Sequence, residues 1–444
     1  MRWFVLCWLT AMSVAGPAAG TPLPLSLAEA LERARAASPR LAELDAQRRA
    51  AEAGLAGAQA ERMPRVDLAA GYARNSDVPE LSLTLPGLGT RTLFPNIPDT
   101  WRAHAGVTVP LWTSGRIESG ITAADRLFQA AGLDLTSAAH ELTLETREAY
   151  WSFVTARESA RVLAEAVASY QAHRKTSQDR LDLGIAARNE VLAVQVELDR
   201  AELARLSAEN AAAVAEANLV RLTGLPPGTT IEPTEPLDAP ANPEANPGDN
   251  PGDDTEALVA AALANRPEIA ALEQRIAAAR ATVDLQRSLA RPQAGFSFGY
   301  DYARPNNRIL PLRDAFEGTW SAGVTLSFNA FDGGRTAAAV TQAEARAEAL
   351  EQQLEAIRRF LRQEVTARRL DLANARATLP VIAHSLDAAR ENLRVAGDRY
   401  HEGVIPSSEL LDAETALLRV GLDQTAAVTR LHMALARLDR AVGR

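Results

Sequence analysis

The chain has 444 residues, a formal net charge of −9 and long stretches of Ala, Leu, Glu and Arg, a composition typical of long helices. The acidic balance argues against a nucleic-acid partner. The single cysteine, Cys7, excludes a disulfide framework.

The first twenty residues have the pattern of a secretory signal peptide. Arg2 precedes an apolar core over 3–14, and small residues follow up to Gly20. The alternative is a membrane anchor, but the apolar run is too short to span a bilayer, and no later stretch reaches the ~20 apolar residues that a membrane helix needs. We therefore expect residues 1–20 to be a signal peptide.

Most of the remaining chain reads as an internal duplication, with residues 28–224 echoed by 255–443. The matching pairs are Gly71-Tyr72 with Gly299-Tyr300, Ala105–Val109 with Ala322–Leu326, and Asp179-Arg180 with Asp398-Arg399. The spacing is too long for a solenoid. We predict a first structural repeat over 21–224, a proline-rich connection over 225–254 and a second repeat over 255–444.

Each repeat contains two short segments in which apolar and polar residues alternate, as expected of strands. These segments lie at 66–72, 101–109, 296–302 and 320–328. Their length, with Tyr and Trp near the ends, fits an outer-membrane barrel with aromatic girdles. An antiparallel sheet over a soluble core would show the same alternation.

A long helical stretch and a shorter return helix follow each strand pair. No proline occurs between Pro110 and Pro226, so a helix of about 60 residues, ~90 Å long, is predicted up to Gly184. The equivalent stretch up to Gly403 contains Pro380, which is expected to kink it or to end a segment. Helices of this length predict a coiled-coil structure outside any compact domain.

Four strands are too few to close a barrel, because small barrels already need about eight. Open strand edges cannot face lipid. The strands must therefore be completed by further copies of the chain, which predicts an oligomeric membrane tube with a helical extension.

The order helix, strand, strand, long helix, Gly turn and return helix, given twice behind a signal peptide, resembles TolC-type outer-membrane efflux proteins. The most specific stretch is Asp398–Gly403 followed by Glu409–Leu417, with a first-copy counterpart in Asp179–Gly184. The resemblance implies a homotrimer in the outer membrane, docked through a periplasmic adaptor protein to an inner-membrane pump of the RND or ABC type.

The fold predicted from residues and resemblance together is an α+β membrane protein: a trimeric β-barrel with four strands per chain, continued by a long α-helical coiled-coil periplasmic tunnel and built from two internal repeats. Its function would be a passive export duct across the outer membrane and periplasm. The alternative is a self-standing porin or a structural periplasmic spacer. A porin has no use for the long helices, and a spacer has no use for lipid-facing strands.

The resemblance also implies an entrance at the periplasmic tip, ringed by acidic side chains. The matching residues are Glu409 and Asp412, with Glu190 in the first copy. A competing explanation is local, because an acid in the first turn of a helix complements the helix dipole. Asp412 lies one turn further into the helix, so a place in the entrance ring is favoured most for this residue.

The hairpin turns carry the other predicted gating residues. Gly184 and Gly403 are expected to need positive φ or close approach. The family closes its tip partly through a tyrosine and a basic residue, and Tyr400 matches the tyrosine. Ile405 occupies the basic position, so the latch must differ here.

Chemistry-bearing motifs are missing from the sequence. It has no nucleophile elbow, P-loop or His-Glu-x-x-His motif, and the six histidines show no metal-ligand spacing. We expect no catalytic residues, no cofactor and no metal site, and hence a conduit rather than an enzyme.

Overall fold

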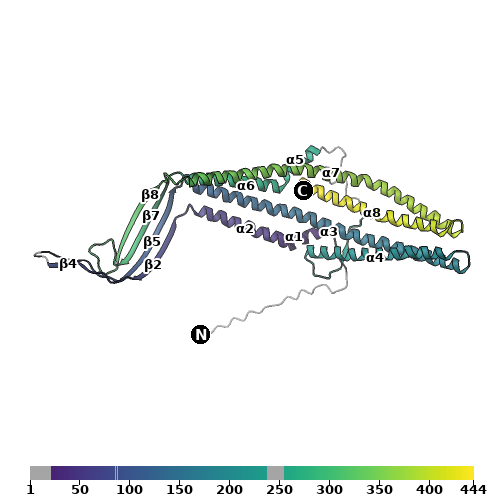
Figure 1. Cartoon of the computed structure of the whole chain (residues 1–444), viewed down its shortest axis with the longest axis horizontal. Helices are drawn as coiled ribbons and strands as arrows, with labels where there is room; N and C mark the ends of the chain where they lie inside the picture. Colours follow the sequence, from purple (N-terminus) through teal and green to yellow (C-terminus); the bar gives the residue numbers. More distant parts are fainter. Residues whose placement is uncertain (1–21, 86, 88, 238–254) are drawn as a thin grey trace, which may run out of the picture. The chain divides into compact units, whose positions relative to one another are not determined.

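The computed structural model describes residues 22–85, 87, 89–237 and 255–444 (Figure 1). The expected signal peptide and residues 238–254 of the expected connection lie outside this part. The chain divides into two compact units. One comprises Leu44–Leu135 and Glu268–Ile357; the other comprises Thr136–Pro267, Arg358–Arg444 and the described part of Met1–Glu43.

The first of these units is built around a four-stranded antiparallel sheet, in the order β2-β5-β7-β8 (Figure 1). Its strands are β2 (Arg65–Arg74), β5 (Asp99–Trp112), β7 (Gln293–Arg304) and β8 (Glu317–Ser327). All four segments predicted from alternation lie in these strands. The outer two, β2 and β8, each have one edge that pairs with no strand among the described residues.

The strand register shows which residues share a face of this sheet. One row across it is Leu68, Ala105, Tyr300 and Trp320; the next row is Ala69, His104, Asp301 and Thr319. Successive side chains of a strand point to opposite faces. The first row is therefore apolar and the second more polar, and Leu68 and Trp320 are exposed in the single chain.

An imidazole–carboxylate pair occupies the polar face. His104 Nδ1 lies 3.0 Å from Asp301 Oδ1 across β5 and β7. The imidazole lies over two glycines: a Cβ at Gly106 would be 2.8 Å from His104 Nε2, and one at Gly299 would be 3.1 Å from its Cε1. Glycine at these positions therefore leaves room for the ring between neighbouring strands.

The segment 74–101 contains a further hairpin. It is formed by β3 (Leu81–Leu85) and β4 (Gly89–Phe94), which pair only with each other. The sequence between the two strands includes Gly87 with φ +84°, a conformation that glycine adopts without strain.

Four long helices dominate the rest of the chain. They are α3 (Arg116–Asp182), α4 (Arg188–Thr223), α7 (Arg335–His401) and α8 (Ser407–Val442). α3 and α7 both have 67 residues, and α4 and α8 both have 36. The residues of α3 and α7 before Thr136 and Arg358 belong to the sheet-containing unit.

Pro380, expected to kink this helix or to end a segment, lies inside α7 and does not end it. A proline removes one backbone donor and crowds the preceding turn, at a cost of about 3 kcal/mol. Leu372, Ala375, Leu386 and Ala389 are buried on both sides of it. Packing along the helix therefore offsets one local defect.

Short elements precede each strand pair. They are β1 (Leu23–Leu25), α1 (Leu27–Ala37), α2 (Pro39–Ala60), β6 (Ile231–Pro233), α5 (Thr255–Asn265) and α6 (Pro267–Ser288). The α1 helix starts at a Ser cap, since Ser26 Oγ accepts from the Glu29 amide at 3.1 Å. Pro39 and Pro267 open α2 and α6, the position where a missing N–H is tolerated.

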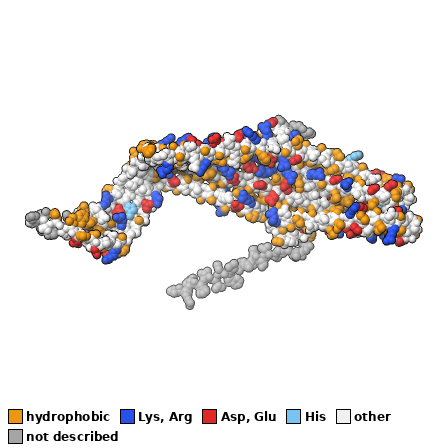
Figure 2. Space-filling view, in the orientation of Figure 1, with side chains coloured by type: hydrophobic (Ala, Val, Ile, Leu, Met, Phe, Trp, Pro, Cys, Tyr) orange, Lys and Arg blue, Asp and Glu red, His pale blue; other side chains and the backbone are white. Residues whose placement is uncertain are grey.

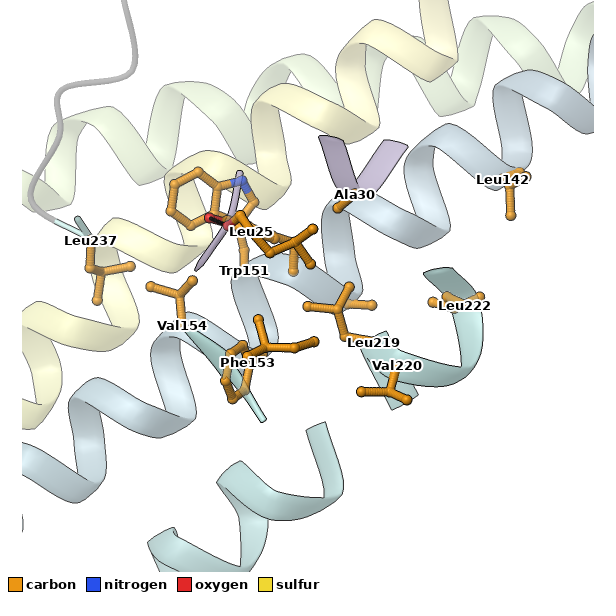
Figure 3. Close-up of a cluster of buried hydrophobic side chains, with 13 residues drawn as sticks. Leu25, Ala30, Leu142, Trp151, Phe153, Val154, Leu219, Val220, Leu222 and Leu237 are labelled. Atoms are coloured by element: carbon orange, nitrogen blue, oxygen red, sulfur yellow. Dashed lines mark hydrogen bonds between the residues drawn. The ribbon is translucent and has the colours of Figure 1, made fainter. Parts of the chain in front are cut away.

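The main core of the helical unit gathers where β1 and β6 pair beside α3 and α4 (Figure 3). Leu25, Trp151, Phe153 and Leu219 are among its buried members. Gly224 ends α4 at φ +66°, and a Cβ there would be 2.5 Å from that of Ala37. This close approach fixes the end of α4 against the end of α1.

On the face seen in Figure 2, basic, acidic and hydrophobic side chains are interspersed along the helices. No helix in the described ranges is both long and apolar enough to cross a membrane.

Candidate functional site

The two helical hairpins turn through the same backbone geometry. Gly184 has φ +74° and Gly403 has φ +75°. In the first turn the Ile185 amide donates to Arg180 O at 3.0 Å, and in the second the Val404 amide donates to Arg399 O at 2.9 Å. This pattern satisfies helix-end carbonyls and needs a left-handed residue. Neither glycine has an atom within 4 Å of an added Cβ, so backbone conformation alone favours Gly at both positions.

The three predicted entrance acids lie in different environments. Glu409 and Asp412 are exposed near the start of α8, and their carboxylates have no hydrogen bond or ion pair with any described residue. Glu190 instead accepts from the Ala187 amide at 3.4 Å, at the start of α4. That contact is a helix cap. The structure therefore gives Glu190 a capping contact and places Glu409 in the first turn of α8, where it complements the helix dipole, whereas Asp412 lies beyond that turn.

Tyr400 joins the two hairpins. Its buried hydroxyl lies 3.1 Å from Ser177 Oγ on α3. The Arg180 guanidinium lies 4.2 Å from the centroid of the Tyr400 ring, a cation–π contact, and donates to the carbonyls of Tyr400 and His401. A basic residue does therefore meet the tyrosine, but it comes from the other hairpin of the same chain.

Ile405, at the position where the family carries a basic residue, is buried. It packs with Tyr400, Leu410 and Ala413 in an apolar cluster that joins the end of α7 to the start of α8. A charged side chain in this place would be costly without a partner. An apolar contact of Ile405 therefore anchors the second turn.

A buried polar group lies beside this cluster. His173 Nδ1 on α3 is 2.8 Å from Glu414 Oε2 on α8, with side chains only 1% and 6% exposed. His173 Nε2 lies 2.9 Å from Ser407 Oγ, and Ser169 Oγ donates to Glu414 Oε1 at 2.7 Å. Because a carboxylate only accepts, Nδ1 carries the proton.

We call these connected side chains the tip network: Ser169, His173, Ser177, Arg180, Tyr400, Ser407 and Glu414. The rings of His173 and Tyr400 are 5.3 Å apart at 66°, which links its two halves. Removing the partner of a buried carboxylate leaves an uncompensated charge, at a typical cost of about 3–5 kcal/mol. The network therefore ties the two hairpins together through buried polar groups.

Motif reading identified Tyr400 but missed His173, Ser177 and Glu414. One signal was available, because Ser169, His173 and Ser177 follow each other at four-residue steps and so line one face of α3. Two of them, His173 and Ser177, are buried, so this face is polar although it is covered. Their partner Glu414 has no such local signature.

Comparison with known proteins agrees with this architecture. The family model "Outer membrane efflux protein" matches residues 30–225 and 258–444. Protein CyaE of Bordetella pertussis is 27% identical over 409 residues, which cover 90% of this chain and 82% of CyaE. Alkaline protease secretion protein AprF of Pseudomonas aeruginosa is 26% identical over 63% of this chain and 57% of its own length.

Among solved structures, the outer-membrane channel OprN shares the fold, with a TM-score of 0.78 and 23% identity over 94% of this chain and 89% of OprN. The chain belongs to the outer membrane efflux protein family. This is a family of channels rather than enzymes, whose fold combines a barrel with a helical tunnel. The protein is thus an outer-membrane duct of a tripartite efflux or secretion system, extending into the periplasm.

Proposed function

We propose that three copies of the chain form one channel, with a twelve-stranded barrel. The supporting observation is the open sheet: within the part of the chain that the structure describes, β2 and β8 each lack a partner on one edge, and all three internal pairings are antiparallel. A β8 strand laid against the β2 strand of a neighbouring copy continues this alternation. Closure removes the edges, which lipid would not tolerate.

The apolar row that includes Leu68 and Trp320 would then face lipid, and the row with His104 and Asp301 would face the lumen. Crosslinking of purified protein in detergent tests the assembly. We expect bands up to a covalent trimer. A monodisperse monomer that retains its β-sheet signal would overturn the proposal.

The duplicated organisation is also proposed, as repeats over 21–224 and 255–444 behind a cleaved signal peptide at 1–20. Equal helix lengths in the two halves support it. The two closing glycines support it further: Gly224 abuts Ala37 at the end of α1, and Gly443 abuts Asn265 at the end of α5. N-terminal sequencing of the mature protein tests the cleavage.

The hairpin tips are proposed as the regulated entrance. Glu409 and Asp412 are free of intrachain partners among the described residues, so three copies of each could form a cation-selective ring. Glu190 stays a weaker candidate because its carboxylate caps α4. Tyr400, Gly184 and Gly403 are proposed to shape the gate itself.

Opening of such an entrance requires α7 and α8 to move relative to α3, and the tip network resists that movement. The resting state proposed here is therefore closed by contacts inside each copy, through His173, Glu414 and Tyr400. Variants of these residues should raise the open probability of single channels without changing trimer formation.

The duct is proposed to couple to an RND or ABC pump through an adaptor protein. A groove of 360 Å³ between α3, α7 and α8 supports docking of an adaptor helix near the tips, because it carries charges of both signs beside apolar side chains; Glu158, Arg390 and Leu418 are among its lining residues. The name of AprF, an alkaline protease secretion protein, supports a secreted protein as one class of cargo.

Affinity purification from membranes, with the co-eluting pump identified by mass spectrometry, tests both points. Recovery of the trimer without an adaptor or pump would favour a self-standing porin.

A further inference from the structure

The polar face of the four-stranded sheet carries an ionisable side chain that the proposed gate does not use. His104 on β5 lies opposite Asp301 on β7, and its Nδ1 is 3.0 Å from Asp301 Oδ1. Because a carboxylate only accepts hydrogen bonds, Nδ1 carries the proton, and Nε2 of the neutral ring can take up another. The two side chains are 37% and 31% exposed, so water reaches the pair from this face.

The other imidazole nitrogen lies near a second carboxylate. A Cβ built on Gly106 would be 2.8 Å from His104 Nε2 and 3.3 Å from Asp67 Oδ2, so both atoms lie beside the same point above this glycine. Asp67 comes from β2, and its other oxygen accepts from Arg65 Nε at 2.9 Å. A proton taken up at Nε2 would therefore place a positive charge between carboxylates of two different strands.

The β8 strand adds no charge beside this pair. Thr319 lies opposite Asp301, and Ser321 Oγ would be 3.7 Å from a Cβ built on Gly299, next to the imidazole. The charged residue of β8 on the polar face is Glu317 at its first position, 3.6 Å from Arg313 in the preceding segment. Hydroxyl groups therefore face His104 from this side of the sheet.

The charges of the polar face cancel while His104 is neutral. Arg65 pairs with Asp67, and Glu317 pairs with Arg313. Arg102, two positions from His104 on the same strand, is exposed and has no hydrogen bond or ion pair with any described residue. Its charge balances that of Asp301. Ionised His104 would therefore leave one positive charge in excess on each copy, and three in a trimer.

We infer that His104 sets the ion selectivity of the barrel lumen according to pH, separately from the acids at the hairpin tips. The inference rests on the trimeric barrel proposed above, in which the row with His104 and Asp301 faces the lumen. Side chains fill the interior of an eight-stranded barrel, so twelve strands leave an aqueous lumen. Histidine is the side chain whose charge ordinarily changes between pH 5 and 8. In mild acid the lumen wall becomes positive and favours anions.

Reversal potentials of reconstituted trimers under a salt gradient test this at pH 7.5 and pH 5.5. The Glu409→Ala, Asp412→Ala background removes the contribution of the entrance acids. Dilute salt is needed, because the Debye length is about 30 Å at 0.01 M but about 10 Å at 0.1 M. The cation-to-anion permeability ratio should fall roughly twofold or more between the two pH values.

Two variants of His104 isolate its charge. His104→Gln keeps a hydrogen-bonding side chain but cannot ionise, so the fall in the permeability ratio should be largely lost. His104→Lys is charged at both pH values, so the low ratio should already be present at pH 7.5. His384→Gln changes an exposed histidine of α7, outside the strands, and should keep the full pH-dependent fall.

Cysteine labelling checks the orientation on which the inference rests. Thr319 lies in the polar row beside Asp301, whereas Ala322 lies in the apolar row opposite Phe298. A charged, membrane-impermeant thiol reagent should reduce the conductance of Thr319→Cys and leave Ala322→Cys unchanged. The reverse result, or absence of a trimer, would refute the proposed barrel and the inference with it. Correct labelling together with an undiminished pH-dependent fall in His104→Gln would overturn the inference alone and leave the barrel intact.

Discussion

His173 on α3 and Glu414 on α8 form a buried imidazole–carboxylate pair, with Nδ1 and Oε2 2.8 Å apart. Ser407 and Ser169 satisfy their remaining polar atoms. The pair belongs to two different hairpins of one chain. Any movement that separates these hairpins must therefore expose or unpair both groups, which gives the closed tip a defined energetic cost.

Substitution of His173 by Ala should loosen the tip. It leaves the Glu414 carboxylate buried without its main partner, and we expect a loss of about 3–5 kcal/mol from the closed arrangement. Single-channel recordings in planar bilayers should show a strongly raised open probability. His401→Ala removes an exposed imidazole from the same tip, so it serves as the control and should behave like wild type. An unchanged open probability in the His173 variant would show that the tip network does not control gating.

The double substitution Asp412→Ala with Glu409→Ala should reduce the preference for cations and weaken block by divalent cations. Three copies of two unpaired carboxylates would otherwise concentrate cations at the entrance. Reversal potentials under a salt gradient measure the preference. Glu348→Gln, at an exposed acid of α7 far from the hairpin turns, is the matched control and should leave selectivity unchanged. Equal selectivity in the double variant and wild type would restrict these acids to helix capping.

His432 should make the helical unit less stable in mild acid. Its ring stacks on Trp151 at 3.6 Å, its Nε2 has no hydrogen-bond partner among the described residues, and burial lowers the pKa of this imidazole below its ordinary 6.5. The unfolded chain therefore binds a proton below about pH 6.5 that the folded chain resists. The stability that the neutral His432 contributes is therefore present above about pH 6.5 and is lost as the pH falls below that value.

Melting curves at pH 7.5 and 5.5 check this effect. His432→Phe keeps a ring on Trp151 but cannot titrate, so its melting temperature should fall less between the two values than that of wild type. His384→Phe changes an exposed histidine of α7 and should show the wild-type difference. Identical pH sensitivity of His432→Phe and wild type would contradict the prediction.

Substitution by Ala should lower the free energy of unfolding at the two turn glycines and raise it at a helical glycine. Gly184→Ala and Gly403→Ala force a Cβ into a left-handed conformation and should cost about 1–2 kcal/mol each. Gly397→Ala lies within α7 with no atom near the added Cβ, so it should stabilise by roughly 0.5–1 kcal/mol. Urea unfolding monitored by circular dichroism compares the three. Destabilisation by Gly397→Ala equal to that of the turn variants would show that these substitutions act through something other than backbone conformation.

Local pattern was sufficient to locate the strands. Alternation around Phe298 and Trp320 predicts one apolar face, and strand register aligns that face across the sheet. The long helices were also predictable, because proline and glycine are sparse within them. The local pattern does not predict that α7 continues through Pro380, since the packing that offsets the proline involves other helices. The β3–β4 hairpin was missed because its strands are short and lie in a proline-containing segment.

The pairings within the tip network could not be predicted from the sequence for a different reason. The His173–Glu414 contact joins residues 241 positions apart, and the His173–Ser407 contact joins residues 234 apart. No local periodicity encodes such a pair. Sequence reasoning could place Tyr400 by resemblance, but Arg180 as its cationic partner required the packing of α3 against α7.

The same separation has a consequence for biogenesis. The α3–α4 hairpin is complete in the chain nearly two hundred residues before Ser407 has been synthesised, so His173 remains without its partners while the second half is still being made. Contacts of long sequence separation form late because a large loop must first close. A chain interrupted before Ser407 would therefore leave His173 without Ser407 and Glu414 on that face of α3, and only the finished chain would bury it.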